Sequence, residues 1–186
     1  MKVASLLLVV LLAACASQTI EPSYYLLRSN HDLQSRELNP SEKYSMGKVE
    51  IAAYLDQPGL LMETASGEMR PARHNLWAEP MYEAIRNFLL VEVAQAKGED
   101  ILPYRLNKSA TVIDVRVDQL HGTYDGKAKL VAYWWLRRDG EVIATYQFAE
   151  SQTLTTDGYG ALVAAQETLL TKLAKQIAAT TTPATP

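Results

Sequence analysis

Hydrophobic and polar residues alternate most regularly in the second half of the chain. Three runs there, 111–123, 127–137 and 141–152, have the two-residue period of half-buried strands. They are separated by Asp125-Gly126 and Asp139-Gly140, and Asp-Gly pairs favour two-residue hairpin turns. The pattern predicts an antiparallel meander of three strands with one face exposed to solvent. In the first run the expected buried side is Ile113, Val115 and Val117, and the expected wet side is Asp114, Arg116 and Asp118.

Shorter segments with strand-like composition precede this meander. Residues 23–28 are rich in aromatic and aliphatic side chains, and residues 48–52 alternate polar and apolar positions. Two further strands are expected at 60–64 and 68–73, because the turn-forming pairs Pro58-Gly59 and Ser66-Gly67 precede them.

Two segments have the three- and four-residue spacing of amphipathic helices. The first begins after Glu79-Pro80 and ends at Gly98, and the second begins at Asp157 as a plausible N-cap. The apolar stripe of the first contains Met81, Ile85, Phe88, Leu89 and Ala96, and that of the second contains Leu162, Val163, Leu169, Leu170, Leu173 and Ile177.

The order of these elements predicts an α+β fold, a largely antiparallel sheet with two helices packed on one face. We expect a single domain over residues 23–178. Residues 179–186 are rich in Thr, Ala and Pro, which predicts a disordered tail.

The N-terminus has the layout of a secretory signal peptide over residues 1–14. Lys2 precedes an apolar run that ends at Ala14, and this run is shorter than the roughly 20 residues that a spanning helix needs. Leu12-Ala13-Ala14-Cys15 also resembles the bacterial lipobox, which implies cleavage by signal peptidase II between Ala14 and Cys15 and lipidation of Cys15. The alternative is an ordinary secreted protein with a chance cysteine there.

Lipidation would make residues 15–22 a tether between the membrane and the domain. Several acyl chains on Cys15 would hold the protein firmly, whereas one chain alone binds only marginally. Such lipoproteins are usually kept at the inner membrane by Asp after the cysteine, and here Ala16 and Ser17 follow. The resemblance therefore implies anchoring on the periplasmic face of the outer membrane.

Composition and motifs give no positive indication of an enzyme. The net charge of −3 leaves no basic footprint for nucleic acid, and Cys15 is the only cysteine. His31, His74 and His121 lack neighbours at metal-ligand spacing, so we expect surface histidines and no metal or cofactor. Glu79 and Glu83 lie one turn apart, which could serve catalysis but is more simply a complement to the helix dipole.

One strand is apolar on both faces. Along 127–137, Val131, Tyr133 and Trp135 alternate with Ala128, Leu130, Ala132, Trp134 and Leu136. A helix or loop could cover the first set. The alternative is an exposed aromatic surface that binds a partner.

Several sequence motifs together resemble those of the PqiC-type (YmbA-like) auxiliary lipoproteins of ABC- and MCE-type transport systems. They are the lipobox at Cys15, Tyr24-Tyr25-Leu26-Leu27, Gly47-Lys48-Val49-Glu50-Ile51, Tyr54-Leu55-Asp56-Gln57-Pro58-Gly59 and Trp77-Ala78-Glu79-Pro80-Met81. Gln57 departs from the basic residue, and Met81 from the Leu, that are common in the family. Trp77 is expected in the core beside the helix start.

The resemblance implies a non-enzymatic part of an envelope transport machine with a fold similar to the N-terminal domain of TolB. The implied partners are a periplasm-spanning MCE-domain protein (PqiB-like) and, indirectly, an inner-membrane PqiA-like protein, with lipid as the cargo. Symmetry allows a homo-oligomeric ring of copies around the tip of the MCE protein. The alternatives are a structural lipoprotein of the outer membrane and a periplasmic lipid-binding carrier.

Overall fold

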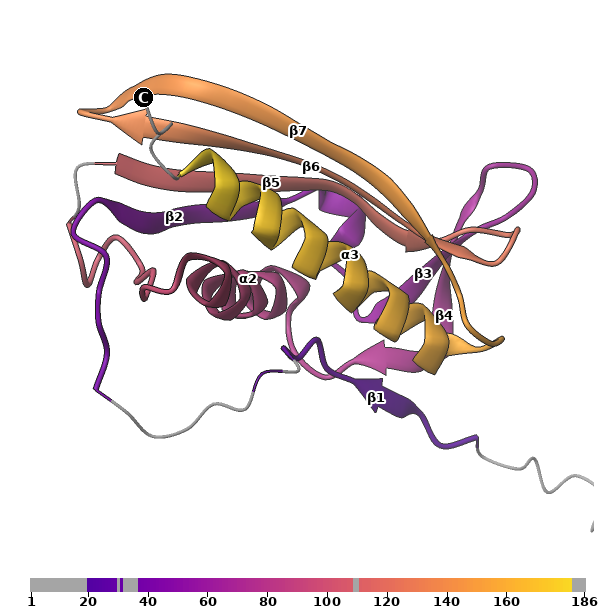
Figure 1. Cartoon of the computed structure of the whole chain (residues 1–186). Coiled ribbons are helices and arrows are strands. Elements are labelled where there is room, and N and C mark those ends of the chain that lie inside the picture. The colour runs from indigo at the N-terminus through magenta and orange to yellow at the C-terminus, as the bar shows by residue number, and fades with distance from the viewer. Residues whose placement is uncertain (1–19, 30, 32–36, 109–110, 182–186) are drawn as a thin grey trace, which may run out of the picture.

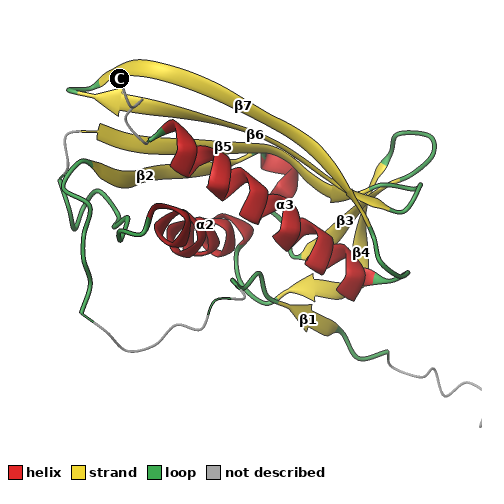
Figure 2. Ribbon diagram, viewed as in Figure 1, coloured by secondary structure: helices red, strands yellow, loops and turns green. Residues whose placement is uncertain are grey.

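One mixed sheet of seven strands carries two long helices on one of its faces (Figures 1 and 2). The computed structural model describes residues 20–29, 31, 37–108 and 111–181. The predicted α+β class is confirmed. The elements are β1 (Ser23–Tyr25), β2 (Tyr44–Ile51), the short helix η1 (Ala53–Leu55), β3 (Gly59–Glu63), β4 (Met69–Trp77), α2 (Met81–Lys97), β5 (Thr111–Gly122), β6 (Lys127–Arg138), β7 (Glu141–Thr153) and α3 (Tyr159–Thr180).

The sheet is more parallel than the sequence pattern indicated. Its order is β1-β4-β3-β5-β6-β7, and β2 also pairs with β5. The pairs β3/β4, β5/β6 and β6/β7 are antiparallel, whereas β1/β4, β2/β5 and β3/β5 are parallel. The meander is thus confirmed, and the remainder of the sheet joins segments that are far apart in the chain.

The two hairpin loops of the meander differ. Asp139 and Gly140 have φ values of 51° and 87°, as a two-residue turn with two left-handed residues requires, so the prediction is confirmed there. At the first loop only Gly126 has a positive φ, and the Thr123 N–H donates to the Lys127 carbonyl at 2.7 Å. The predicted two-residue turn is wrong there: three residues, 124–126, form the loop, because the Thr123 side chain bonds to both Asp125 and Lys127.

Both helices lie close to their predicted positions. Helix α2 ends at Gly98, whose φ of 74° is left-handed. Helix α3 begins after Gly158 rather than Asp157, and no side chain caps it. It also continues into the predicted tail as far as Thr180, because the indole N–H of Trp134 donates to Thr180 Oγ1 at 3.1 Å and ties the helix end to the sheet. Residues 182–186 lie outside the described residues.

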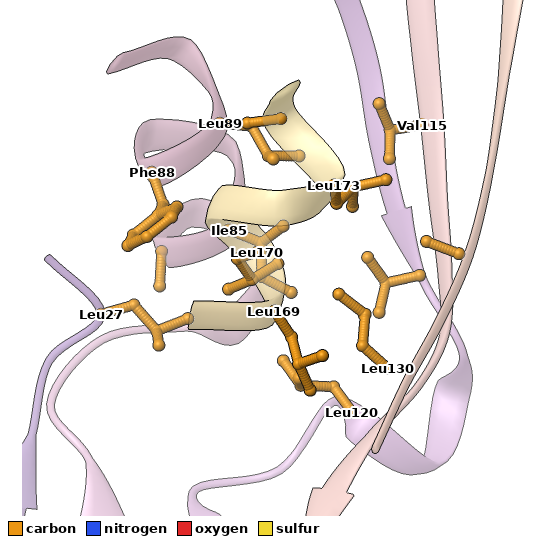
Figure 3. Packing of buried hydrophobic residues seen from close by; sticks show 14 of the residues in the cluster. Leu27, Ile85, Phe88, Leu89, Val115, Leu120, Leu130, Leu169, Leu170 and Leu173 are labelled. Carbon is orange, nitrogen blue, oxygen red and sulfur yellow. The ribbon is translucent and has the colours of Figure 1, made fainter. Parts of the chain in front are cut away.

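The core fills the space between the sheet and the two helices. Figure 3 shows Ile85, Phe88 and Leu89 of α2 opposite Leu169, Leu170 and Leu173 of α3, with Val115, Leu120 and Leu130 of the sheet beside them. Leu27, which follows β1, is 1% exposed and closes this core from the N-terminal side.

The proposed lipid anchor lies outside the structure. The predicted signal peptide (1–14), the cleavage site at Ala14 and Cys15, and the first part of the tether fall outside the described residues, which begin at Ile20. Within the described part of the chain, neither helix is long and apolar enough to cross a membrane.

Candidate partner-binding surface

The face of β5, β6 and β7 turned away from the helices carries the apolar side chains singled out from the sequence. Both α2 and α3 lie on the opposite face (Figure 2), where Ala128, Leu130, Ala132, Trp134 and Leu136 are all buried as predicted. Val131 is 9% exposed, whereas Tyr133 and Trp135 are half-buried. We call Val131, Tyr133 and Trp135 the aromatic patch.

Polar residues of the neighbouring strands flank the two aromatic residues of the patch. Trp135 is in register with Asp114 on β5 and Thr145 on β7. Tyr133 is in register with Arg116 and Gln147, and the Gln147 amide donates to the Tyr133 hydroxyl at 3.2 Å. Aromatic side chains inside a polar rim are typical of protein–protein interfaces.

Asp114, at the edge of the aromatic patch, differs from the prediction. It faces the helix-free side, as alternation requires, but it is 3% exposed rather than wet. Its carboxylate accepts hydrogen bonds from Arg137 Nε at 3.0 Å and from the Lys48 backbone N–H at 2.7 Å. A Cβ at Gly47 would lie 2.1 Å from Asp114 Oδ1, so glycine is required where β2 bulges around this carboxylate. The ion pair thus fixes one end of the surface.

The two phrases around Pro58 and Trp77 meet on another part of the surface. The Trp77 N–H donates to the Pro58 carbonyl at 2.7 Å, and residues 56–58 and 77–81 together line a cavity of about 370 Å³. Trp77 is 8% exposed, which confirms that it belongs to the core.

The Tyr54 hydroxyl donates to the Asp118 carbonyl at 3.1 Å. Its partial burial, together with the Asp118 carboxylate, raises the pKa of Tyr54 to about 12.

The same junction holds the N-terminal segment in place. The Ala78 N–H donates to the Tyr25 carbonyl at 2.8 Å, and Arg28 pairs with Glu79 at 2.6 Å. Glu79 therefore has a structural partner in addition to its position near the start of α2. The phrases fix the segment through which the predicted tether enters the fold, and they supply no reactive group.

The histidines are not grouped. His31 and His74 are exposed, as predicted, and His31 Nε2 lies 3.6 Å from Glu92 Oε1. The prediction for His121 is wrong: it is 3% exposed, because the ends of β3 and β5 pack together and bring Glu63 Oε2 to 3.9 Å from its Nδ1. Among the described residues, no group of three or more His, Cys, Asp and Glu side chains could hold a metal ion.

These features define a small α+β protein with a candidate binding surface and no catalytic constellation within the described residues. The profile of one family, described as the ABC-type transport auxiliary lipoprotein component, matches residues 25–178, and the chain belongs to that family. It is a transport-associated lipoprotein family rather than an enzyme family, which confirms the expectations of a PqiC-type lipoprotein and of a non-enzymatic function.

Two relatives agree with this assignment, and two solved structures agree with the fold. The chain is 29% identical over 154 residues to the intermembrane transport lipoprotein PqiC of Escherichia coli, covering 82% of each chain, and equally similar to PqiC of Shigella flexneri. A crystal structure of an uncharacterized protein superposes with a TM-score of 0.74 at 23% identity, covering 88% of this chain and all of that one. A protein from Xanthomonas campestris superposes with a TM-score of 0.68 at 17% identity, covering 83% and 92%. At these identities the two structures show the fold.

Proposed function

We propose that this protein is the lipoprotein subunit of an MCE-type intermembrane lipid transport complex. In this proposal Cys15 carries acyl chains in the periplasmic leaflet of the outer membrane, and the domain binds the tip of a periplasm-spanning MCE-domain protein. The observation that carries the proposal is the match of nearly the whole domain to a family of transport lipoproteins. The similarity to the intermembrane transport lipoprotein PqiC supports it.

The aromatic patch is the surface that we assign to this partner. Tyr133 and Trp135 alternate along β6 with the residues that are buried beneath the helices, so they lie on the opposite face of the sheet. Aromatic residues in a polar rim supply much of the binding free energy at interfaces. The core does not depend on them, since the buried face of β6 consists of the alternate residues. Removing both aromatic side chains should therefore weaken partner binding and leave the fold intact.

The test is a crosslinking pull-down from native membranes with the lipidated protein as bait. We expect an MCE-domain protein to be recovered with the unaltered chain. With Tyr133→Ser/Trp135→Ser the amount recovered should fall about tenfold, which corresponds to a loss of about 1.4 kcal/mol of binding free energy. The matched control is Tyr104→Ser/Leu106→Ser, which removes two side chains that are 42% and 68% exposed in the α2–β5 loop. Cys15→Ser should also reduce recovery, because the anchor sets the local concentration.

One result would reject this function, and another would reject only the docking surface. Recovery of only outer-membrane or cell-wall proteins would favour a structural lipoprotein. Equal recovery with the aromatic and control variants would leave the transport complex but exclude the aromatic patch as its docking surface. Circular dichroism of each variant separates loss of binding from loss of folding.

A further inference from the structure

An apolar pocket lies where the β5–β6 loop meets the start of α3. Its volume is about 300 Å³, within the range of small-ligand sites. Leu162 of α3 is 1% exposed, Met62 and Leu154 are half-buried, and Tyr124 is 69% exposed. The exposures place the leucines and the methionine along the wall and Tyr124 at the mouth. Among the described residues that line it, Asp157 alone is charged.

The backbone holds this pocket open. The Leu154 N–H donates to the Gly126 carbonyl at 3.0 Å, which fixes the loop against the end of β7. A Cβ at Gly126 or at Gly158 would have no heavy atom within 4 Å, so the lining is bare at both glycines. A Cβ at Gly122, at the end of β5, would lie 2.3 Å from Met62 Sδ, which shows that Met62 already packs on that strand. The space is therefore preformed.

The pocket lies at the end of the molecule from which the predicted tether leaves. Strand β1 runs parallel to β4 with Ser23 beside Asn75, so the chain before Ser23 heads towards the start of β4. There β4 pairs with Met62, and Met62 pairs with Gly122. Figure 1 shows residues 20–22, before β1, leaving on the side where α3 begins. The eight residues 15–22 reach at most about 28 Å when extended, so lipidation of Cys15 would keep this end close to the membrane.

We propose that this pocket binds one acyl chain of a phospholipid from the membrane that holds Cys15. Water in an apolar pocket hydrates hydrocarbon surface, which is unfavourable. An acyl chain from the adjacent leaflet would cover that surface and would itself remain in apolar surroundings. Tyr124 at the mouth suits this position, because the ring and hydroxyl of tyrosine favour the membrane–water interface. Asp157 disfavours an anionic head group within the pocket. The inference rests on the lipid anchor of the proposed function and not on the MCE-domain partner.

Photo-crosslinking with the lipidated full chain in phospholipid vesicles tests this site. The probe is a phosphatidylethanolamine with a diazirine midway along one acyl chain, and crosslinked peptides are identified by mass spectrometry. We expect adducts at Met62, Leu154 or Leu162 and a reduction of about tenfold in Leu154→Trp, whose indole fills the space. Tyr124→Ser, which alters only an exposed side chain, should reduce labelling without affecting the fold. Tyr104→Ser, in the α2–β5 loop, should not reduce it.

Three outcomes would overturn the proposal, whereas a fourth would reject only the proposed function. Adducts confined to exposed loops, or labelling that persists in a folded Leu154→Trp, would show that no acyl chain enters. If the pocket crosslinks to the N-terminal peptide only when the diazirine acid is carried by Cys15, the occupant is the protein's own anchor. Pocket labelling that continues without recovery of an MCE-domain protein would reject the transport complex and leave the lipid site standing.

Discussion

At the scale of single residues, Gly59 shows how a family phrase can be explained by backbone packing alone. A Cβ there would lie 2.5 Å from the Ala72 carbonyl oxygen and 3.1 Å from Pro71 Cβ, so a rigid strand would have to move. We expect Gly59→Ala to lower the free energy of unfolding by about 1–3 kcal/mol. Gly160→Ala is the control, since its Cβ meets nothing within 4 Å and alanine favours the helix by up to about 0.5 kcal/mol. Urea unfolding midpoints that move equally would contradict this explanation.

The residues that sequence reasoning placed wrongly share one cause. Asp114 and His121 were predicted to be solvent-exposed. The alternation of hydrophobic and polar residues, and the closeness of a residue to a turn, describe only the strand on which that residue lies. Asp114 is buried by the Lys48 backbone of β2, and His121 by the packing of β3 on the end of β5. Both partners are remote in sequence, and no local pattern reports them. Trp77 was predicted correctly because its apolar surface beside a helix start has few alternatives to burial.

At the scale of elements, the segment after β1 is held to α3 through a carboxylate with a perturbed pKa. The Arg28 backbone N–H donates to Glu167 Oε1 at 3.0 Å, but burial is the larger effect and raises the pKa of Glu167 above 4.5, with the Glu92 carboxylate adding to it. A raised pKa means that the folded state binds more protons than the unfolded state in the window just above 4.5, so this group's contribution to stability falls as pH rises through that window.

We therefore expect Glu167→Gln to be more stable than the unaltered protein at neutral pH. Glutamine keeps an acceptor for the Arg28 N–H and removes the cost of a half-buried charge. Below the ordinary pKa the carboxyl is protonated in both states, so the advantage should disappear near pH 4. Thermal unfolding at both pH values measures the difference. An advantage that is constant between them would show that charge burial is not its source.

The elements differ in how far the sequence predicts them. The meander was predictable because long alternating runs are joined by local turns, and a loop such as Asp139-Gly140 fixes its own geometry. The three parallel pairings were not, since each unites strands that are separated by other elements, as β1 and β4 are by β2 and β3. At Asp125-Gly126 the Thr123 side chain extended the turn, which the dipeptide alone does not reveal.

At the scale of the whole molecule, the aromatic patch and the apolar pocket lie in different places. Tyr133 and Trp135 occupy the second half of β6 on the helix-free face, whereas the pocket lies beyond the start of β6 and uses Leu162 of α3. This arrangement would let the anchored end contact the membrane while the open face of the sheet remains accessible to a partner. The two sites share no residue. Substitutions in one site should therefore act independently of substitutions in the other.

The separation predicts a double dissociation. Tyr133→Ser/Trp135→Ser should lose recovery of the MCE-domain protein and retain acyl-chain crosslinking in the pocket. Leu154→Trp should show the reverse, because its side chain lines the pocket and lies outside the aromatic patch. Both measurements on both variants decide the matter, with Tyr104→Ser/Leu106→Ser as the control for the pull-down and Tyr104→Ser as the control for the crosslinking. A single variant that abolishes both while still folding would mean that partner and lipid bind to one coupled site, and the assignment of separate surfaces would be wrong.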